Sequence, residues 1–273
     1  SDQGYEKQIK ERVARRREEQ LAAMVEETTP REVLTFSPDN RPRSYPVVQG
    51  HERWLMRAIS DSGRNLGVVR DRVLGQVTIR RHHLILDLNA GTGLLTWEAL
   101  RRAPEGGVWA LARDEQTAKA LHQQAERLPE LERPIVLVGG LDALPEIIRQ
   151  STAAQRHEET PDPVRFDLIV GRSSLTRCAD RTATARLLAG LLLPGGAISL
   201  AETIPRRTQR LYALADTKAL GRELSEALRE AEEAIYADAG DPMTNWDVEE
   251  LREAFVGAGL EPVTAETREF VRR

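Results

Sequence analysis

One short stretch of the chain combines an acidic residue with a turn made of small residues. Between His83 and Thr96 the sequence reads HLILDLNAGTGLLT. An apolar run ends at Asp87, and the glycine-containing turn that follows leads into residues with the spacing of a helix. Glycines let the backbone approach a ligand closely, and the first N–H groups of the next helix are unpaired. The stretch predicts a site for a flat or anionic group; the alternative is a tight turn with no ligand.

The position of the acid separates two classes of cofactor. A dinucleotide fingerprint reads G-x-G-x-x-G, with its acid about 20 residues later. Here no third glycine follows and the acid closes the strand, which disfavours a dinucleotide-dependent oxidoreductase. The D-x-x-x-G-x-G pattern resembles motif I of the class I S-adenosylmethionine-dependent methyltransferases. The resemblance implies that Asp87 contacts the amine at the methionine end of that cofactor. It also implies cofactor contacts from the turn residues Asn89, Ala90, Gly91, Thr92 and Gly93.

Two later segments are similar to the same family. The Phe166-Asp167-Leu168-Ile169-Val170 strand matches its F-D-x-I pattern, and Leu193-Pro194-Gly195-Gly196 matches the turn before its fifth strand. The resemblance covers residues 83 to 262. It implies an α/β fold, a Rossmann-like and mostly parallel sheet with helices on both faces, with an N-terminal helix and a helical insertion after strand five.

The hydrophobic pattern predicts the elements that would position these residues. Expected strands span 84–87, 108–111, 135–138, 166–170 and 197–201, with helices at 94–102, 116–127, 143–150 and 183–192. A helical insertion is expected at 205–239, and a last helix at 248–256 with Thr244 or Asn245 as its cap. A strand at 261–271 would finish the chain. The family places a two-stranded hairpin there, so we expect the sequence to stop before the final strand.

The N-terminal region predicts a connection to another domain. Residues 1–30 have the pattern of an amphipathic helix, 31–50 that of a linker, and 51–273 would form the methyltransferase-like domain. The segment GYEKQIKERV resembles the last helix of RarA-type AAA+ recombination ATPases. The resemblance implies that such an ATPase precedes this domain, that the chain is a piece of a longer polypeptide, and that DNA or replication proteins are its partners.

The remaining cofactor contacts of the family are only partly matched. Ala112 stands where a carboxylate normally binds both ribose hydroxyls, and this loss weakens the expected affinity for S-adenosylmethionine. Asp114 either reaches the ribose or caps the following helix. Leu141 would pack on the adenine, and Asp142 would either accept from its amine or cap its own helix. Gly171 completes the expected cofactor site.

No catalytic residue is identified by motif. The family's N/D-P-P-Y/F turn is replaced by Gly171-Arg172-Ser173-Ser174, and Cys178 is not in a Pro-Cys context. Arg172 and Ser173 are expected to face the methyl acceptor or to be plain surface residues. Two functions follow: an S-adenosylmethionine-binding domain that methylates nucleic acid or protein, or a catalytically inactive module that binds protein or DNA.

Composition excludes several other classes. The 273 residues carry a net charge of −4, which predicts no global affinity for nucleic acid. A single cysteine rules out an internal disulfide and a multi-cysteine metal site, and the five histidines have no metal-ligand spacing. No apolar run reaches the ~18 residues of a membrane helix. We expect a cytoplasmic protein that binds neither metal nor membrane.

Overall fold

The computed structural model describes residues 63, 65–156, 163–176, 178–214, 221–238, 240–241, 243–244 and 246–270. The predicted N-terminal helix (1–30) and linker (31–50) lie outside these ranges, as does the start of the domain at residue 51.

Five parallel strands form the central sheet. They are β1 (Leu84–Asp87), β2 (Gly107–Ala112), β3 (Ile135–Val138), β4 (Phe166–Arg172) and β5 (Leu192–Ala201). Their order is β3-β2-β1-β4-β5, and every neighbouring pair is parallel. At the end of β1, Asp87 pairs with Ala110 of β2 and Val170 of β4. The predicted α/β, Rossmann-like sheet is confirmed.

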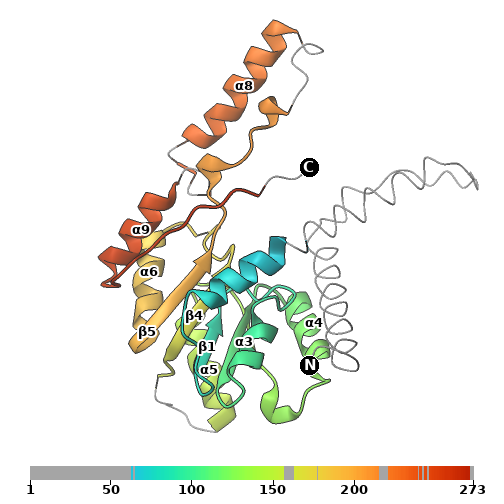
Figure 1. Cartoon of the computed structure of the whole chain (residues 1–273), viewed down its shortest axis with the longest axis vertical. Helices are drawn as coiled ribbons and strands as arrows, with labels where there is room; N and C mark the ends of the chain where they lie inside the picture. Colours follow the sequence, from blue (N-terminus) through green and yellow to red (C-terminus); the bar gives the residue numbers. More distant parts are fainter. Residues whose placement is uncertain are drawn as a thin grey trace, which may run out of the picture.

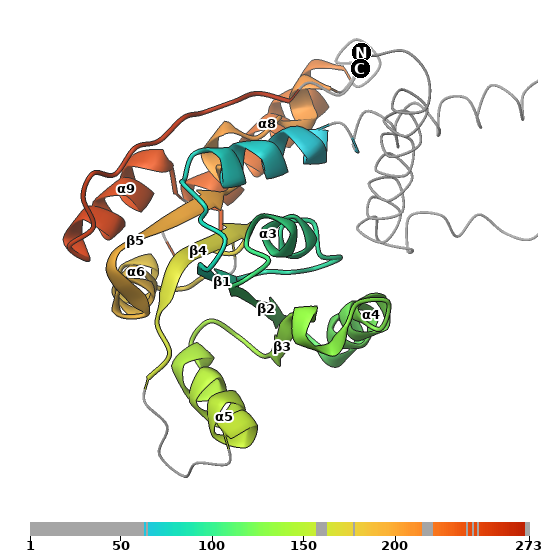
Figure 2. The same cartoon turned by 60° about the horizontal axis from the view of Figure 1, so that its bottom comes forward.

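Helices cover both faces of this sheet. The helix at 65–75, α3 (Thr96–Arg102) and α4 (Glu115–Ala125) lie on one face, and α5 (Leu144–Arg156) and α6 (Arg181–Gly190) lie on the other (Figure 2). A 3-10 turn, η2 (Glu130–Glu132), precedes β3. The last helix, α9 (Val248–Gly257), packs beside α6 (Figure 1). None of the helices in the described ranges is both long enough and apolar enough to cross a bilayer.

Two apolar cores lie on the two faces, as expected for strands buried on both sides. On one face, Val73 and Leu74 of the helix at 65–75 pack on α3 and on β1 and β4. On the other face, the rings of Phe166 and Trp109 pack edge to face with their centroids 5.9 Å apart. Leu188 of α6 and Phe255 of α9 belong to the same core. The buried Ser199 hydroxyl of β5 donates to the Val73 carbonyl at 2.6 Å, and this bond connects the helix at 65–75 to the sheet.

The insertion after β5, expected to be helical over 205–239, is divided into separate helical pieces. Its described parts are two 3-10 turns, η3 (Pro205–Arg207) and η4 (Leu211–Ala213), and one α-helix, α8 (Arg222–Ala237). Pro205 has no N–H to donate, and Gly221, at φ 75°, lies immediately before α8. α8 projects away from the sheet (Figure 1).

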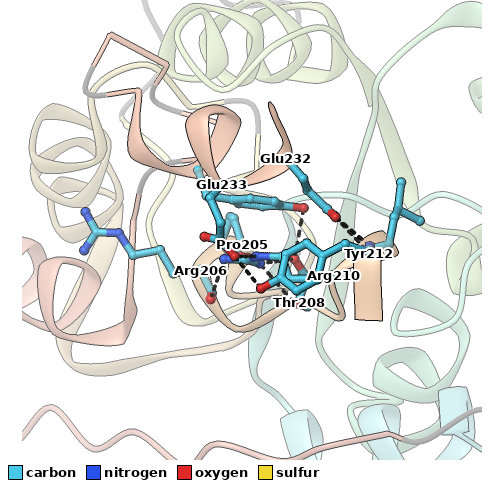
Figure 3. A network of polar contacts seen from close by, with 9 residues as sticks. Pro205, Arg206, Thr208, Arg210, Tyr212, Glu232 and Glu233 are labelled. Atoms are coloured by element: carbon cyan, nitrogen blue, oxygen red, sulfur yellow. Dashed lines mark hydrogen bonds and ion pairs between the residues drawn. The ribbon is translucent and has the colours of Figure 1, made fainter. Parts of the chain in front are cut away.

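The insertion is held together by polar contacts to α8 (Figure 3). The buried Glu232 accepts from the backbone N–H groups of Leu211 at 2.7 Å and Tyr212 at 2.9 Å. Its neighbour Glu233 accepts from the Tyr212 hydroxyl at 2.7 Å and pairs with Arg210 at 3.1 Å. These bonds satisfy the first N–H groups of η4 with a carboxylate, which is a favourable arrangement at a helical N-terminus.

The prediction of a C-terminal strand at 261–271 is wrong for residues 261–270, which the structure describes and which form no strand. The side chains there are mostly polar and exposed, so a strand would have little apolar surface to bury. The segment instead runs back toward the helix at 65–75 (Figure 1). There a Glu266 carboxylate oxygen lies 3.4 Å from a guanidinium nitrogen of Arg72. The predicted cap of α9 is also corrected: Asp247 fills that position in a capping box with Glu250.

Candidate binding site at the carboxyl edge

The carboxyl ends of β1 and β4 meet at the point where the strand order reverses. From β1 the chain proceeds to β2 and β3 on one side, whereas β4 leads to β5 on the other. Ligands of open α/β sheets bind outside the carboxyl ends of the strands at such a switch point. Asp87 closes β1 and Arg172 closes β4, so the sheet brings these charged residues to one place.

Asp87 is fully buried and bonded to its own loop. Its carboxylate accepts from the Thr96 hydroxyl at 2.7 Å and from the Asn89 N–H at 3.3 Å. Burial raises the pKa of Asp87 to about 6, against the lowering effect of the Thr96 and Asn89 bonds and of the Arg172 charge. Asp87 therefore holds the turn against the start of α3, and any contact to a cofactor amine stays a prediction.

Asn89 joins the two strand ends. Its side-chain N–H donates to the carbonyl of Arg172 at 2.9 Å and to that of Ser173 at 3.3 Å. Ser173 has φ 51°, a left-handed conformation that is uncommon for a residue other than glycine. Strain of this kind is concentrated at functional sites, where the surroundings enforce it.

The two glycines of the turn have different surroundings. Gly93 has φ 89°, and a Cβ added there would lie 1.9 Å from the Trp97 indole nitrogen. The same indole nitrogen is 3.3 Å from the Thr92 carbonyl, and Trp97 also packs on the alanine cluster that includes Ala90 and Ala112. The positive φ and the Trp97 indole together explain why residue 93 is glycine, without any ligand contact.

Beside Gly91 the space is open. Its φ is 50°, it is exposed, and an added Cβ would meet only the Asn89 carbonyl at 4.0 Å. A ligand can approach the turn on this side, where the backbone carries no side chain.

The second predicted contact falls at the end of β2. Ala112 is buried and ends the strand. The exposed Asp114 caps α4, because its carboxylate accepts from the Thr117 N–H at 2.8 Å, and this bond is the main cause of its lowered pKa. The capping interpretation of Asp114 is thus observed, and its ribose contact stays a prediction.

The third predicted contact follows β3. Leu141 is half-buried against the core, and Asp142 is exposed. Asp142 turns back on the loop, since a Cβ on Gly140 would lie 2.5 Å from its Oδ1. The adenine contacts of Leu141 and Asp142 stay predictions.

Gly171 has a structural role in β4. A Cβ there would lie 2.2 Å from the Ser174 hydroxyl, so only glycine lets the loop after β4 fold back on its own strand.

Glu202, directly after β5, is a site residue that the motifs did not indicate. Its Oε1 accepts from the Ser174 N–H at 2.7 Å. Burial raises the pKa of Glu202 to about 7, opposed by the backbone N–H groups of Ser174 and Leu175, by the Arg172 charge and by the Thr176 hydroxyl. Burial also lowers the pKa of Arg172, and the charges of Asp87 and Glu202 oppose that effect. An acid at a strand end is the signal that marks Asp87, and the same signal at β5 could have found Glu202.

Other reactive groups are engaged elsewhere. The half-buried Cys178 thiol lies 2.7 Å from the Thr184 hydroxyl. Within the described ranges, no group of three His, Cys, Asp or Glu residues could hold a metal ion.

Comparison with known proteins gives structural neighbours only. No protein-family model and no curated protein matches the sequence. The CcbJ methyltransferase from Streptomyces caelestis aligns at 15% identity with a TM-score of 0.36, over 48% of this chain and 47% of that protein. The mycolic acid cyclopropane synthase CmaA1, solved with SAH and CTAB, aligns at 15% identity with a TM-score of 0.48, over 74% of this chain and 61% of that protein. The cyclopropane synthase MmaA2 from Mycobacterium tuberculosis aligns at 16% identity with a TM-score of 0.47, over 70% of this chain and 59% of that protein. The chain thus spans about half to three fifths of the length of these neighbours.

Proposed function

We propose that the carboxyl edge of the sheet binds S-adenosylmethionine and that the chain is a methyltransferase-like domain. The observation that carries the proposal is the buried Asp87, which fixes a glycine turn at the β1–β4 switch point. The open side of Gly91 gives the cofactor room to lie against the backbone. When bound, S-adenosylmethionine supplies a methyl group on a sulfonium, so the chain mainly needs to orient an acceptor.

Each site residue has a role in this proposal. Asp87 and Asn89 hold the turn in shape, and Gly91 provides the surface for close approach. Arg172 and Glu202 lie on the β4–β5 side, where an acceptor would enter. Without a carboxylate at Ala112, binding lacks a charged contact worth about 1.5–3 kcal/mol.

Calorimetry tests the binding step. We expect the 273-residue chain to release heat with S-adenosylmethionine and with S-adenosylhomocysteine at micromolar dissociation constants. Gly91→Leu fills the open side and is expected to weaken both by at least about tenfold, equivalent to 1.4 kcal/mol. Gly221→Leu is the matched control, because that glycine also has positive φ and no atom near its Cβ position. No heat at millimolar ligand would overturn the proposal.

A second function is favoured by a specific observation. Trp97 fills one side of the turn at Gly93, and Asp114 is used as a helix cap. A domain that kept the fold and lost the chemistry would serve as a module for binding protein or DNA. Such a module would give no heat with S-adenosylmethionine or S-adenosylhomocysteine. Gly91→Leu would then lower the free energy of unfolding only as much as Gly221→Leu does, because both glycines have positive φ.

We further propose that the domain follows a RarA-type AAA+ ATPase, acts in the cytoplasm and methylates nucleic acid or protein near replication forks. The support is the resemblance of GYEKQIKERV, which lies outside the described residues. Sequencing the coding region upstream tests the fusion: an ATPase reading frame joined to residue 1 is expected, and an upstream stop codon would refute it. Tritiated S-adenosylmethionine with DNA, RNA and purified ATPase would then identify the acceptor.

A further inference from the structure

Three buried oxygen atoms without hydrogen-bond partners gather after β4 and β5. They are Ser174 Oγ, Thr176 Oγ1 and Glu202 Oε2, and none makes a hydrogen bond of normal geometry with the residues that the structure describes. The Thr176 hydroxyl does lie near the Glu202 carboxylate and lowers its pKa. Ser174 and Thr176 lie in the loop after β4, and Glu202 directly follows β5. The Ser174 N–H donates to Glu202 Oε1, and the Ser174 hydroxyl lies over Gly171. This arrangement contrasts with Asp87, whose two carboxylate oxygens both accept hydrogen bonds.

Unpaired polar atoms in a protein interior need an explanation. Buried polar groups in folded proteins are nearly always paired, because an unpaired one keeps its full desolvation penalty. Three such atoms at the ends of two neighbouring strands indicate that a partner is missing. The strained φ of Ser173, next to this loop, shows that the surrounding structure enforces the arrangement.

We propose that Ser174, Thr176 and Glu202 form a binding site for a protonated amine. Two hydroxyls and a carboxylate are all hydrogen-bond acceptors, and a primary ammonium group offers three donors. A carboxylate or phosphate ligand would face Glu202 and be repelled.

The neighbouring charges set the strength of this site. Arg172 of β4 faces Glu202 but also Asp87, so its charge is shared between two carboxylates. Arg181 of α6 also acts on Glu202, while its guanidinium stacks over Trp246 at 4.6 Å and acts on Glu250 as well. Burial raises the pKa of Glu202 to about 7 despite the Arg172 charge, so a bound ammonium would stabilise its ionised form.

The position of the site gives the amine a use. It lies at the same carboxyl edge as the glycine turn, on the β4–β5 side. An amine held here would be the methyl acceptor once it has given a proton to the Glu202 carboxylate, which frees the nitrogen lone pair. The nitrogen would then form the N–CH3 bond as the S–CH3 bond of the sulfonium breaks and S-adenosylhomocysteine leaves. This use rests on the proposed function, whereas binding of the amine does not.

NMR on the full chain tests the binding without any cofactor. The probe is methylammonium chloride, and tetramethylammonium chloride is the matched control because it has the same charge and no N–H donor. We expect saturable shifts of the Glu202 carboxyl carbon and the Ser174 amide with methylammonium. With tetramethylammonium we expect roughly tenfold weaker binding or none, as for the loss of charge-assisted hydrogen bonds. Methylammonium should also lower the midpoint of the Glu202 titration.

Two variants separate a ligand site from a structural feature. Glu202→Gln is expected to weaken methylammonium binding at least about tenfold, while the exposed Glu253→Gln leaves it unchanged. The double variant Ser174→Ala with Thr176→Val keeps the carboxylate and should also weaken binding, so the test survives if Glu202→Gln does not fold. Equal shifts with both ammonium salts, or a long-lived internal water at the Ser174 hydroxyl that methylammonium does not displace, would overturn the site. A failure of S-adenosylmethionine to bind would leave this result standing.

Discussion

The Thr96 hydroxyl donates a 2.7 Å hydrogen bond to the Asp87 carboxylate, and both side chains are fully buried. This bond joins the last residue of β1 to the first residue of α3 across the glycine turn. Thr96→Val keeps the shape and removes the donor, so we expect a loss of about 2 kcal/mol in the free energy of unfolding. Urea denaturation measures it, with the exposed Thr182→Val of α6 as the control. Equal losses in the two variants would show that the bond contributes nothing.

Asp87 makes stability depend on pH in an unusual direction. Its pKa rises from an ordinary value of 3.8 to about 6 in the fold, so the folded state binds the proton more tightly than the unfolded state. Its contribution is fully present below about pH 4 and is lost as the pH rises to 6, amounting to about 3 kcal/mol at roughly 1.4 kcal/mol per pKa unit. We expect the free energy of unfolding of wild type minus that of Asp87→Asn to fall over this window. A difference that rises with pH would contradict the assignment.

Gly93 and Trp97 are coupled by direct contact. Gly93→Ala in the wild type should cost several kcal/mol, because the new Cβ collides with the indole and the residue has φ 89°. In a Trp97→Ala background only the conformational cost of about 1 kcal/mol should remain. A double-mutant cycle from thermal or urea unfolding gives the coupling energy. Additive effects would mean that the indole moves aside without cost.

Much of the fold follows from local patterns in the sequence. Each of the five strands is a short apolar run between turn residues, and the pattern predicts each within a few residues, except that β5 begins earlier, at Leu192. The patterns fail where tertiary context decides. The 205–239 segment has helical spacing, but Glu232, a residue about 20 positions away, binds the start of η4, which is a 3-10 turn. The 261–270 segment is mostly polar and exposed, and it pairs with none of the described strands.

The site is less accessible to sequence reasoning than the fold. Asp87 and the glycine turn are adjacent in the chain, so a motif can describe them. Glu202 meets Ser174 only because β4 and β5 are neighbours in the sheet, a contact that spans 28 residues. Likewise the role of Trp97 at Gly93 depends on the turn geometry and leaves no mark in the motif.

Asp114 has two candidate roles that substitutions can separate. Asp114→Ala removes the α4 cap and should cost about 1 kcal/mol in unfolding free energy. Asp114→Asn keeps a good cap and removes the charge, so stability should hold. If Asp114 also binds the cofactor ribose, Asp114→Asn should weaken S-adenosylmethionine binding in calorimetry. Unchanged affinity would leave capping as its whole function.

Glu232 is expected to control the order of the insertion. Glu232→Ala leaves two N–H groups of η4 without their acceptor, while Glu232→Gln keeps one acceptor oxygen. Hydrogen exchange at Leu211 and Tyr212 should accelerate strongly in the first variant and moderately in the second, with the exposed Glu230→Gln unchanged. Equal exchange in all three would exclude this anchoring.

The bond from Ser199 to Val73 spans 126 residues and sets a limit on how the molecule assembles during synthesis. The segment that precedes the first strand cannot find its permanent partner until the fifth strand has left the ribosome, because only that strand supplies the donor. Until then its apolar side, with Val73 and Leu74, has an incomplete cover. Early and late parts of the polypeptide therefore reach their final stability together, and a fragment lacking either one would be prone to aggregate.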